Sequence, residues 1–265
     1  MEHFKVIKPS PALAPYVQRY WILKMDTIFG MEQRIIPNGC MELMFCRGDR
    51  MMFSSGNVLH PVSYIKGQNT KFYDLLLTGK VNLISVSFTP LGMSAFSSVP
   101  ISEFSYGCVD ILDVNDGLLN NLSNRISETV DDETCIRLIE EFLIRRFNPI
   151  RDYNCKRLSA VIHAINNEKQ IDVTTLSEVS CVSYRQFIRV FTEHVGLNPK
   201  EYLRIVRFQR ALSIMNKKPL ISSIDLAFEA GYYDQSHLIN DFKGFTGNTP
   251  LEYLAICQPR SDYFS

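Results

Sequence analysis

The sequence uses one stretch twice, and the second copy begins 51 residues after the first. Residues 196–203 read Gly-Leu-Asn-Pro-Lys-Glu-Tyr-Leu. Residues 247–254 read Gly-Asn-Thr-Pro-Leu-Glu-Tyr-Leu. A repeat of this length indicates one supersecondary unit built twice, and two copies favour a paired module over a solenoid, which needs more units.

Both copies carry the signals that end one helix and begin the next. Gly196 and Gly247 stand where a left-handed residue closes a helix. Asn198 is a good N-cap, and the proline after it suits the first helical position, where its missing N–H costs nothing. Glu201 then completes a capping box. Because the second copy repeats this pattern, we expect a helix start in both, including a long helix over about residues 198–216.

A short helix precedes each of these boundaries. Ser183 opens a capping box, and an apolar stripe follows it at helical spacing. This predicts a helix over residues 183–194, and the second copy predicts one over 234–244. A further capped helix is expected before each, over 173–180 and 223–230. A helix, a tight turn and a second helix with polar outward side chains are typical of a helix-turn-helix unit.

A long motif in the second copy carries a family resemblance. Residues 231–243 read Gly-Tyr-Tyr-Asp-Gln-Ser-His-Leu-Ile-Asn-Asp-Phe-Lys, and the repeated stretch follows them. Together they resemble the C-terminal signature of the AraC/XylS family of bacterial transcription regulators, over roughly residues 155–257. The resemblance implies two helix-turn-helix units joined by the long helix. It also implies that one chain places both recognition helices in successive major-groove segments.

The first part of the chain reads as mostly β, with short strands between turn signals, which favours an antiparallel barrel or sandwich. Asn38 and Gly39 form a hairpin signal. Residues 34–45 and, less specifically, 87–92 resemble an N-terminal domain often attached to AraC-type DNA-binding domains. That resemblance implies a cupin-like β-barrel used for sensing or dimerisation. The expected strands cover residues 16–25, 34–36, 40–46, 58–65, 74–78 and 81–88.

Two helices are expected after the strands, over residues 114–129 and 132–147, each with one apolar stripe. The pair could form a dimer surface or simply pack on the barrel. Pro149 marks the best linker, residues 148–154, because proline ends a helix. We therefore expect an α+β fold with an antiparallel β-barrel before an all-α double helix-turn-helix domain. The expected domains are a sensor or dimerisation domain with the helix pair over residues 1–150, and the DNA-binding domain over 151–265.

The net charge of zero is low for a DNA-binding protein. Residues 1–150 hold 14 Lys and Arg against 16 Asp and Glu, a balance of −2, and residues 151–257 hold 13 against 11, a balance of +2. The basic residues must therefore be well placed. Arg204, Arg207 and Arg210 on the long helix could contact phosphate, or they could form a solvated face or pair with neighbours such as Glu201.

The polar outward faces of the two short helices are the expected DNA-binding surface. Arg185 and Arg189 could donate to guanine O6 and N7 or to phosphate, and Gln235 and Asn240 could read adenine edges or phosphates. Asn240 replaces the arginine usual at its position in the family. His237 suits a capping or backbone role better than base reading. The expected DNA-binding residues are Ser183, Tyr184, Arg185, Ile188, Arg189, Arg204, Arg207, Gln235, Ser236, His237, Ile239, Asn240 and Lys243.

No catalytic set of residues stands out, but four residues are candidates for binding an effector. Glu42 lies on an apolar strand and could bind an effector inside the barrel or face solvent at an edge. Core packing explains Trp21 and Phe88 better than a pocket does. The barrel offers only His3 and His60, and the seven cysteines and five histidines show no metal spacing, so we expect no metal or cofactor. The effector candidates are Trp21, Arg34, Glu42 and Phe88.

Double-stranded DNA is the expected partner. Further candidate partners are a small-molecule effector, a second copy of the chain bound through the 114–147 helix pair, and RNA polymerase. No apolar run approaches a membrane span, no signal peptide is recognised and the cysteines suit a reducing compartment, so we expect a cytoplasmic protein that does not use the membrane. Two alternatives stay open. A cupin-like small-molecule enzyme would show stoichiometric metal with turnover, and a protein-interaction module would be separated by size exclusion with and without DNA.

Overall fold

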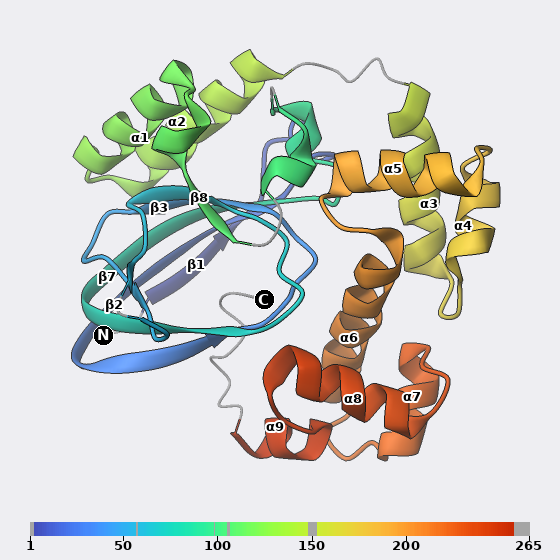
Figure 1. Ribbon diagram of the computed structural model, residues 1–265. Coiled ribbons are helices and arrows are strands. Elements are labelled where there is room, and N and C mark those ends of the chain that lie inside the picture. Colours follow the sequence, from blue (N-terminus) through green and yellow to red (C-terminus); the bar gives the residue numbers. More distant parts are fainter. Residues whose placement is uncertain (1–2, 57, 98, 105–106, 148–152, 257–265) are drawn as a thin grey trace. The chain divides into compact units, whose positions relative to one another are not determined.

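The first half of the chain forms an antiparallel sheet. The computed structural model describes residues 3–56, 58–97, 99–104, 107–147 and 153–256 (Figure 1). The strands pair in the order β1-β2-β7-β3-β6-β8, while β4 pairs with β5 and β7. Their bounds are β1 His3–Ile7, β2 Val17–Ile35, β3 Glu42–Cys46, β4 Met52–Phe53, β5 Val58–Leu59, β6 Ser63–Lys66, β7 Tyr73–Phe88 and β8 Cys108–Asp110.

The predicted α+β fold with an antiparallel sheet before the helices is confirmed. Closure of the sheet into a barrel is not, because the path of paired strands ends at β1 on one side and at β8 on the other among the described residues. In two places, a pair of predicted strands is a single long strand in the structure. Residues 16–25 and 34–36 fall largely within the 19-residue β2, and residues 74–78 and 81–88 lie within the 16-residue β7.

The hairpin predicted at Asn38 and Gly39 is wrong. The strands on either side of this turn, β2 and β3, are not neighbours, because β7 lies between them in the sheet. The segment therefore crosses over a strand instead of joining two paired ones. Gly39 still has the positive φ of +72° that the turn signal implies. A local turn signal reports backbone conformation, whereas the pairing partner depends on a strand 34 residues further along the chain, at Tyr73.

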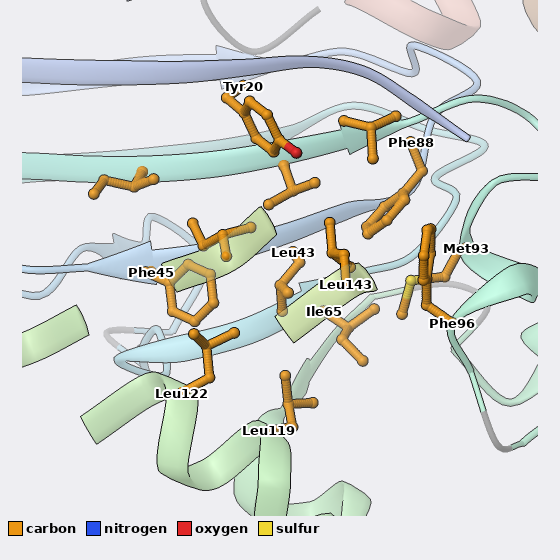
Figure 2. Packing of buried hydrophobic residues seen from close by; sticks show 14 of the residues in the cluster. Tyr20, Leu43, Phe45, Ile65, Phe88, Met93, Phe96, Leu119, Leu122 and Leu143 are labelled. Carbon is orange, nitrogen blue, oxygen red and sulfur yellow. The ribbon is translucent and has the colours of Figure 1, made fainter. Parts of the chain in front are cut away.

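The helix pair packs on one face of the sheet. Helix α1 spans Gly117–Glu128 and α2 spans Asp132–Arg146, close to the predicted ranges. Short 3-10 turns cover Met93–Ala95, Ile101–Phe104 and Ile111–Val114. Figure 2 shows Leu43 and Phe45 of β3 in one apolar cluster with side chains of α1 and α2. Burying such a side chain contributes about 1.5–3 kcal/mol each. The labelled members are Tyr20, Leu43, Phe45, Ile65, Phe88, Met93, Phe96, Leu119, Leu122 and Leu143.

The second half of the chain is helical. Helix α6 spans Pro199–Lys217 and follows the predicted N-cap Asn198, whose side chain accepts from the backbone N–H of Glu201 at 3.0 Å. Figure 1 shows α6 between α3, α4 and α5 on one side and α7, α8 and α9 on the other. The other bounds are α3 Tyr153–Asn167, α4 Val173–Val179, α5 Tyr184–Val195, α7 Ser223–Ala230, α8 Gln235–Thr246 and α9 Pro250–Ile256.

The chain divides into two compact units. One unit holds residues 1–33, 40–68 and 73–150, and the other holds residues 34–39, 69–72 and 151–265. Most of the predicted linker over 148–154, including its boundary between residues 150 and 151, lies outside the described residues. The division into domains at residue 150 therefore stays a prediction. No helix among the described residues has both the length and the apolar character needed to cross a membrane.

Candidate nucleic-acid interface

Helix α5 is held by an apolar inward face and capped at both ends. The Ser183 hydroxyl accepts from the backbone N–H of Gln186 at 3.4 Å, as its capping box predicts. Gly196 closes the helix with a φ of +88°, a conformation that costs glycine little because it has no Cβ. Phe187, Val190 and Phe191 are buried beneath the helix. Tyr184, Arg185 and Arg189 are exposed on the outward face, and Ile188 is half-buried.

Helix α8 repeats this design 51 residues later. The Asp234 carboxylate accepts from the backbone N–H of His237 at 2.7 Å, and Gly247 closes the helix with a φ of +78°. Leu238 and Phe242 are buried, as the apolar stripe predicts. Of the predicted outward residues, Gln235, Ser236, Asn240 and Lys243 are exposed and Ile239 is half-buried. His237, which is expected on neither face, is also half-buried.

Both helices rest on α6 through aromatic contacts. The ring of Tyr202 meets that of Phe191 under α5, with centroids 5.6 Å apart. The ring of Phe208 meets those of Phe242 and Phe245 under α8, each at 5.0 Å. Aromatic pairs at these distances contribute about 0.5–1.5 kcal/mol beyond their buried area. Helix α6 therefore packs against the second helix of both helix-turn-helix units.

The arginines of α6 have partners within the protein. Arg204 donates from Nε and Nη2 to Asp241 Oδ1, at 3.0 and 2.7 Å. The Arg207 guanidinium lies 5.7 Å from the ring centroid of Tyr232. For Arg204 this resolves the alternatives of solvated face and ion pair in favour of an ion pair, and its partner lies on α8. Phosphate contact by Arg204 or Arg207 stays a prediction.

Asp241 is the residue that sequence reasoning missed. Its side chain is only 3% exposed, and it is buried on the same helix as the inward residues Leu238 and Phe242. A signal was present in the repeat, because the residue 51 positions earlier is the buried Val190. An acid that replaces a buried apolar residue needs a cation nearby, and Arg204 provides one. Burial and then the charge of Asp241 raise the pKa of Tyr232 above its ordinary value, which keeps that phenol protonated.

His237 fits the capping role expected of it. Its backbone N–H closes the cap of α8, as described above, and its ring lies edge-on to that of Tyr232, with centroids 5.3 Å apart. Its Nε2 atom is 3.9 Å from Asp241 Oδ2. The imidazole therefore lies beside the Asp241 and Arg204 pair at the start of the helix.

Of the four effector candidates, Trp21 and Glu42 are in direct contact. Glu42 accepts from Trp21 Nε1 at 3.1 Å, from Lys66 Nζ at 2.8 Å and from Ser87 Oγ at 2.8 Å. Phe88 belongs instead to the apolar cluster under the helix pair (Figure 2). Arg34 lies in the second compact unit, where its Nη1 donates to the Thr246 carbonyl at 2.8 Å.

The alternative that Glu42 faces solvent at an edge is wrong. Its residue exposure is 1%, and β3 is an interior strand paired with both β6 and β7. Burial acts to raise the pKa of Glu42, but the Lys66 ammonium and the hydrogen bonds hold it below its ordinary value. The carboxylate therefore stays ionised and paired in the interior of the sheet.

His60, which precedes strand β6, is also buried. Its ring stacks on that of Phe53 with centroids 3.9 Å apart. Burial, followed by the charges of Arg50 and Lys66, lowers the pKa of His60 to about 4. The ring is therefore neutral at physiological pH. Across the described part of the chain, no group of three or more His, Cys, Asp or Glu residues is placed to hold a metal ion.

Two regions of the chain match known protein families. Residues 176–256 match the family described as "Helix-turn-helix domain", and residues 5–110 match "Domain of unknown function (DUF6597)". An uncharacterised helix-turn-helix transcriptional regulator of Haemophilus influenzae is 33% identical over 100 residues, covering 37% of this chain and 33% of the relative. The regulator YbfI of Bacillus subtilis, also uncharacterised, is 32% identical over 70 residues, covering 26% and 25%.

The chain thus spans a quarter to a third of the length of these relatives. Among solved structures, ToxT from Vibrio cholerae aligns over 95% of this chain and 97% of its own, with 10% identity and a TM-score of 0.46, a similarity too low to support a conclusion about activity. Helices α4 to α9 nearly fill the matched C-terminal region, and the repeat, caps and exposed faces described above lie within it. The chain therefore carries a helix-turn-helix domain of the AraC type at residues 176–256, after a domain whose function is unknown.

Proposed function

We propose that this chain is a sequence-specific DNA-binding transcription regulator. It would read two successive major-groove segments with α5 and α8, by equilibrium binding and not by catalysis. One observation carries the proposal: two 12-residue helices occur at the same place in a 51-residue repeat, both with exposed polar faces, and both rest on α6. Two relatives that match part of the chain are named helix-turn-helix transcriptional regulators.

The two helices offer different base-reading chemistry. Arg185 and Arg189 are exposed on α5, and a guanidinium can donate two hydrogen bonds to guanine O6 and N7 or to a phosphate. Gln235 and Asn240 are exposed on α8, and amides suit adenine edges. The first unit would therefore bind with charge-assisted hydrogen bonds and the second with neutral ones. The remaining side chains of these faces would complete the interface: Ser183, Tyr184, Ile188, Ser236, His237, Ile239 and Lys243.

Because the α6 arginines have partners within the protein, we expect them to contribute less to the electrostatic part of DNA affinity. Arg204 is bound to Asp241, so the exposed cations Arg185, Arg189 and Lys243 are the best placed for phosphate contact. Each phosphate contact changes the slope of log K against log salt by about −0.9, so three contacts give a slope of about −2.7. A weak dependence on salt also agrees with the net charge of zero.

Selection of random duplexes by the purified chain tests this proposal. The enriched sequences should contain two conserved segments about one helical turn, or about 10 base pairs, apart. Arg185→Ala should weaken preference in one segment only. Enrichment of no sequence over the starting pool, under salt conditions that allow binding, would contradict the proposed function.

Three finer parts of the proposal concern the first compact unit and its partners. The buried Glu42 and Lys66 pair gives that unit a charged site inside a largely apolar interior, and a small-molecule effector would bind beside it. A groove on α1 and α2 is lined by Leu118, which is 70% exposed, together with Arg125 and Glu141. This groove supports a homodimer through the helix pair, which sedimentation would detect as a doubled mass. Contact with RNA polymerase and a cytoplasmic location follow from the proposed role in transcription.

A further inference from the structure

Arg210 on α6 faces the ends of α3, which packs against α4 of the first helix-turn-helix unit, and of α7, which belongs to the second. Its Nη2 donates to the carbonyl of Ile165 at 3.1 Å and lies 3.5 Å from that of Glu168, at the end of α3. Its Nη1 donates to the carbonyl of Lys169 at 3.2 Å. The same Nη1 lies 3.4 Å from the carbonyl of Ala230, the last residue of α7. One guanidinium thus reaches the C-terminal ends of α3 and α7.

These carbonyls are suitable partners for a cation. The last four carbonyls of a helix have no partner within it, and the helix dipole places partial negative charge there. A guanidinium carries five N–H donors in a fixed plane, so it can serve several acceptors at once. Burial and then the charge of Arg207 lower the pKa of Arg210, a desolvation that the carbonyls offset. The planar guanidinium of an arginine therefore suits this set of carbonyl acceptors.

The backbones of the two units also meet at this point. Gly231 follows α7 with a φ of +89°, and a Cβ added to it would lie 2.1 Å from the carbonyl oxygen of Lys169. No side chain fits at that distance. The first unit contributes the turn before α4, and the second contributes the turn before α8. Arg210 Nη1 would be 3.3 Å from the same Cβ, so the guanidinium covers this contact.

We infer that Arg210, Gly231 and the Lys169 carbonyl form a junction that sets the spacing between α5 and α8. Arg210 is thus a positioning residue for DNA reading, and its role requires no contact with a base. The inference rests on the proposed function. Without the junction, the units are joined through their separate contacts with α6. Neighbouring base pairs are about 3.4 Å apart, so a small tilt between the units moves α8 out of register with its segment.

Affinity as a function of spacer length tests this role. The full chain would be titrated with three duplexes that carry both selected segments, with the spacer unchanged, one base pair shorter and one base pair longer. The wild type should prefer the unchanged spacer. In Arg210→Ala the ratio of dissociation constants between altered and unchanged spacers should fall toward about 1, because the two units then adapt to either spacing.

Lys217→Ala is the matched control. Lys217 is an exposed cation near the end of the same helix, so the variant removes the same charge without touching the junction. It should keep the spacer preference of the wild type. Loss of folded protein would weaken binding to all three duplexes equally, and thus leave the ratio unchanged. A changed ratio therefore reports positioning and not stability.

Two further variants keep the test decisive. Arg210→Lys keeps the charge but not the planar group, so its spacer preference should be intermediate. Gly231→Ala should flatten the preference or move it to another spacer, because the added Cβ pushes the Lys169 carbonyl away. If the wild type discriminates between spacers and folded Arg210→Ala discriminates equally well, the junction has no positioning role. If the wild type binds no bipartite site at all, the proposed function fails first, and the role of the junction in DNA reading fails with it.

Discussion

The two helix-turn-helix units have the same plan and different interiors. Their recognition helices have equal lengths, a left-handed glycine at the end and an oxygen-bearing cap at the start. Under α5 the buried residue is Val190, whereas under α8 the equivalent residue is Asp241, bound to Arg204. The turn before the recognition helix passes through Cys181 in the first unit and Gly231 in the second, both with positive φ. The same arrangement of helices can therefore be held by apolar packing or by an ion pair between a buried carboxylate and a partly exposed arginine.

The two interiors differ in how they stabilise their units and orient their helices. Apolar packing stabilises without directional constraint, whereas an ion pair is worth little net stability yet is costly to break. The first unit would combine an apolar interior with arginines on its DNA face. In the second unit Asp241 pairs with Arg204 of α6, and the outward face of α8 offers neutral amides together with the exposed cation Lys243. We expect the first to dominate affinity and the second to depend more on how its helix is oriented.

The largest expected effect comes from removing Arg204. Arg204→Ala leaves the buried Asp241 carboxylate without its cation and should lower the free energy of unfolding by about 3 kcal/mol. Urea denaturation of the full chain, followed in the helical region of the circular dichroism spectrum, measures this. Arg189→Ala, an exposed arginine of α5, is the control and should stay within about 0.5 kcal/mol of the wild type.

A double variant makes the second unit resemble the first. Asp241→Val with Arg204→Met replaces the ion pair by apolar side chains of similar size, which is often neutral or stabilising. It should recover most of the stability that Arg204→Ala loses, in the same denaturation experiment. Equal instability of the double variant would mean that the pair contributes more than its own buried charge.

We also expect the two units to contribute unequally to DNA affinity. Arg189→Ala should weaken DNA binding by about 1–3 kcal/mol if a guanine contact is lost, because the charged bidentate contact has no replacement. Asn240→Ala should cost less, since its amide makes neutral hydrogen bonds. Titration of both variants against the selected duplex measures the difference. A greater loss from Asn240→Ala would reverse the ranking of the two helices.

The smallest expected effect lies in the turn of the first unit. Cys181 holds a φ of +53°, which is unfavourable for a residue with a Cβ. Cys181→Gly relieves that strain but gives the unfolded chain more freedom, so a net gain of about 0.5 kcal/mol is expected. Cys181→Ala keeps the Cβ and should show no gain. Thermal unfolding of the three proteins compares them, and a lower midpoint for Cys181→Gly would contradict the strain argument.

The C-terminal helices were predictable because their signals are local. Ser183, Asn198 and Gly196 each act within one turn of their own position, and the repeat presents the same pattern twice. The sheet was harder, because the pairing of β7 with both β2 and β3 depends on residues far apart in the sequence. Asp241 could have been found by aligning the two copies. The contacts of Arg210 could not, because its partners are backbone carbonyls and leave no pattern of side chains.

We expect α5 and α8 to read two segments on one face of a duplex from a single rigid module. Inserting about 5 base pairs, half a helical turn, between the selected segments tests it most directly. Footprinting of the full chain should show both segments protected on the original duplex. On the duplex with the insertion, only the segment read by α5 should remain protected, because the other is rotated away. Protection of both segments with unchanged affinity after the insertion would contradict the account.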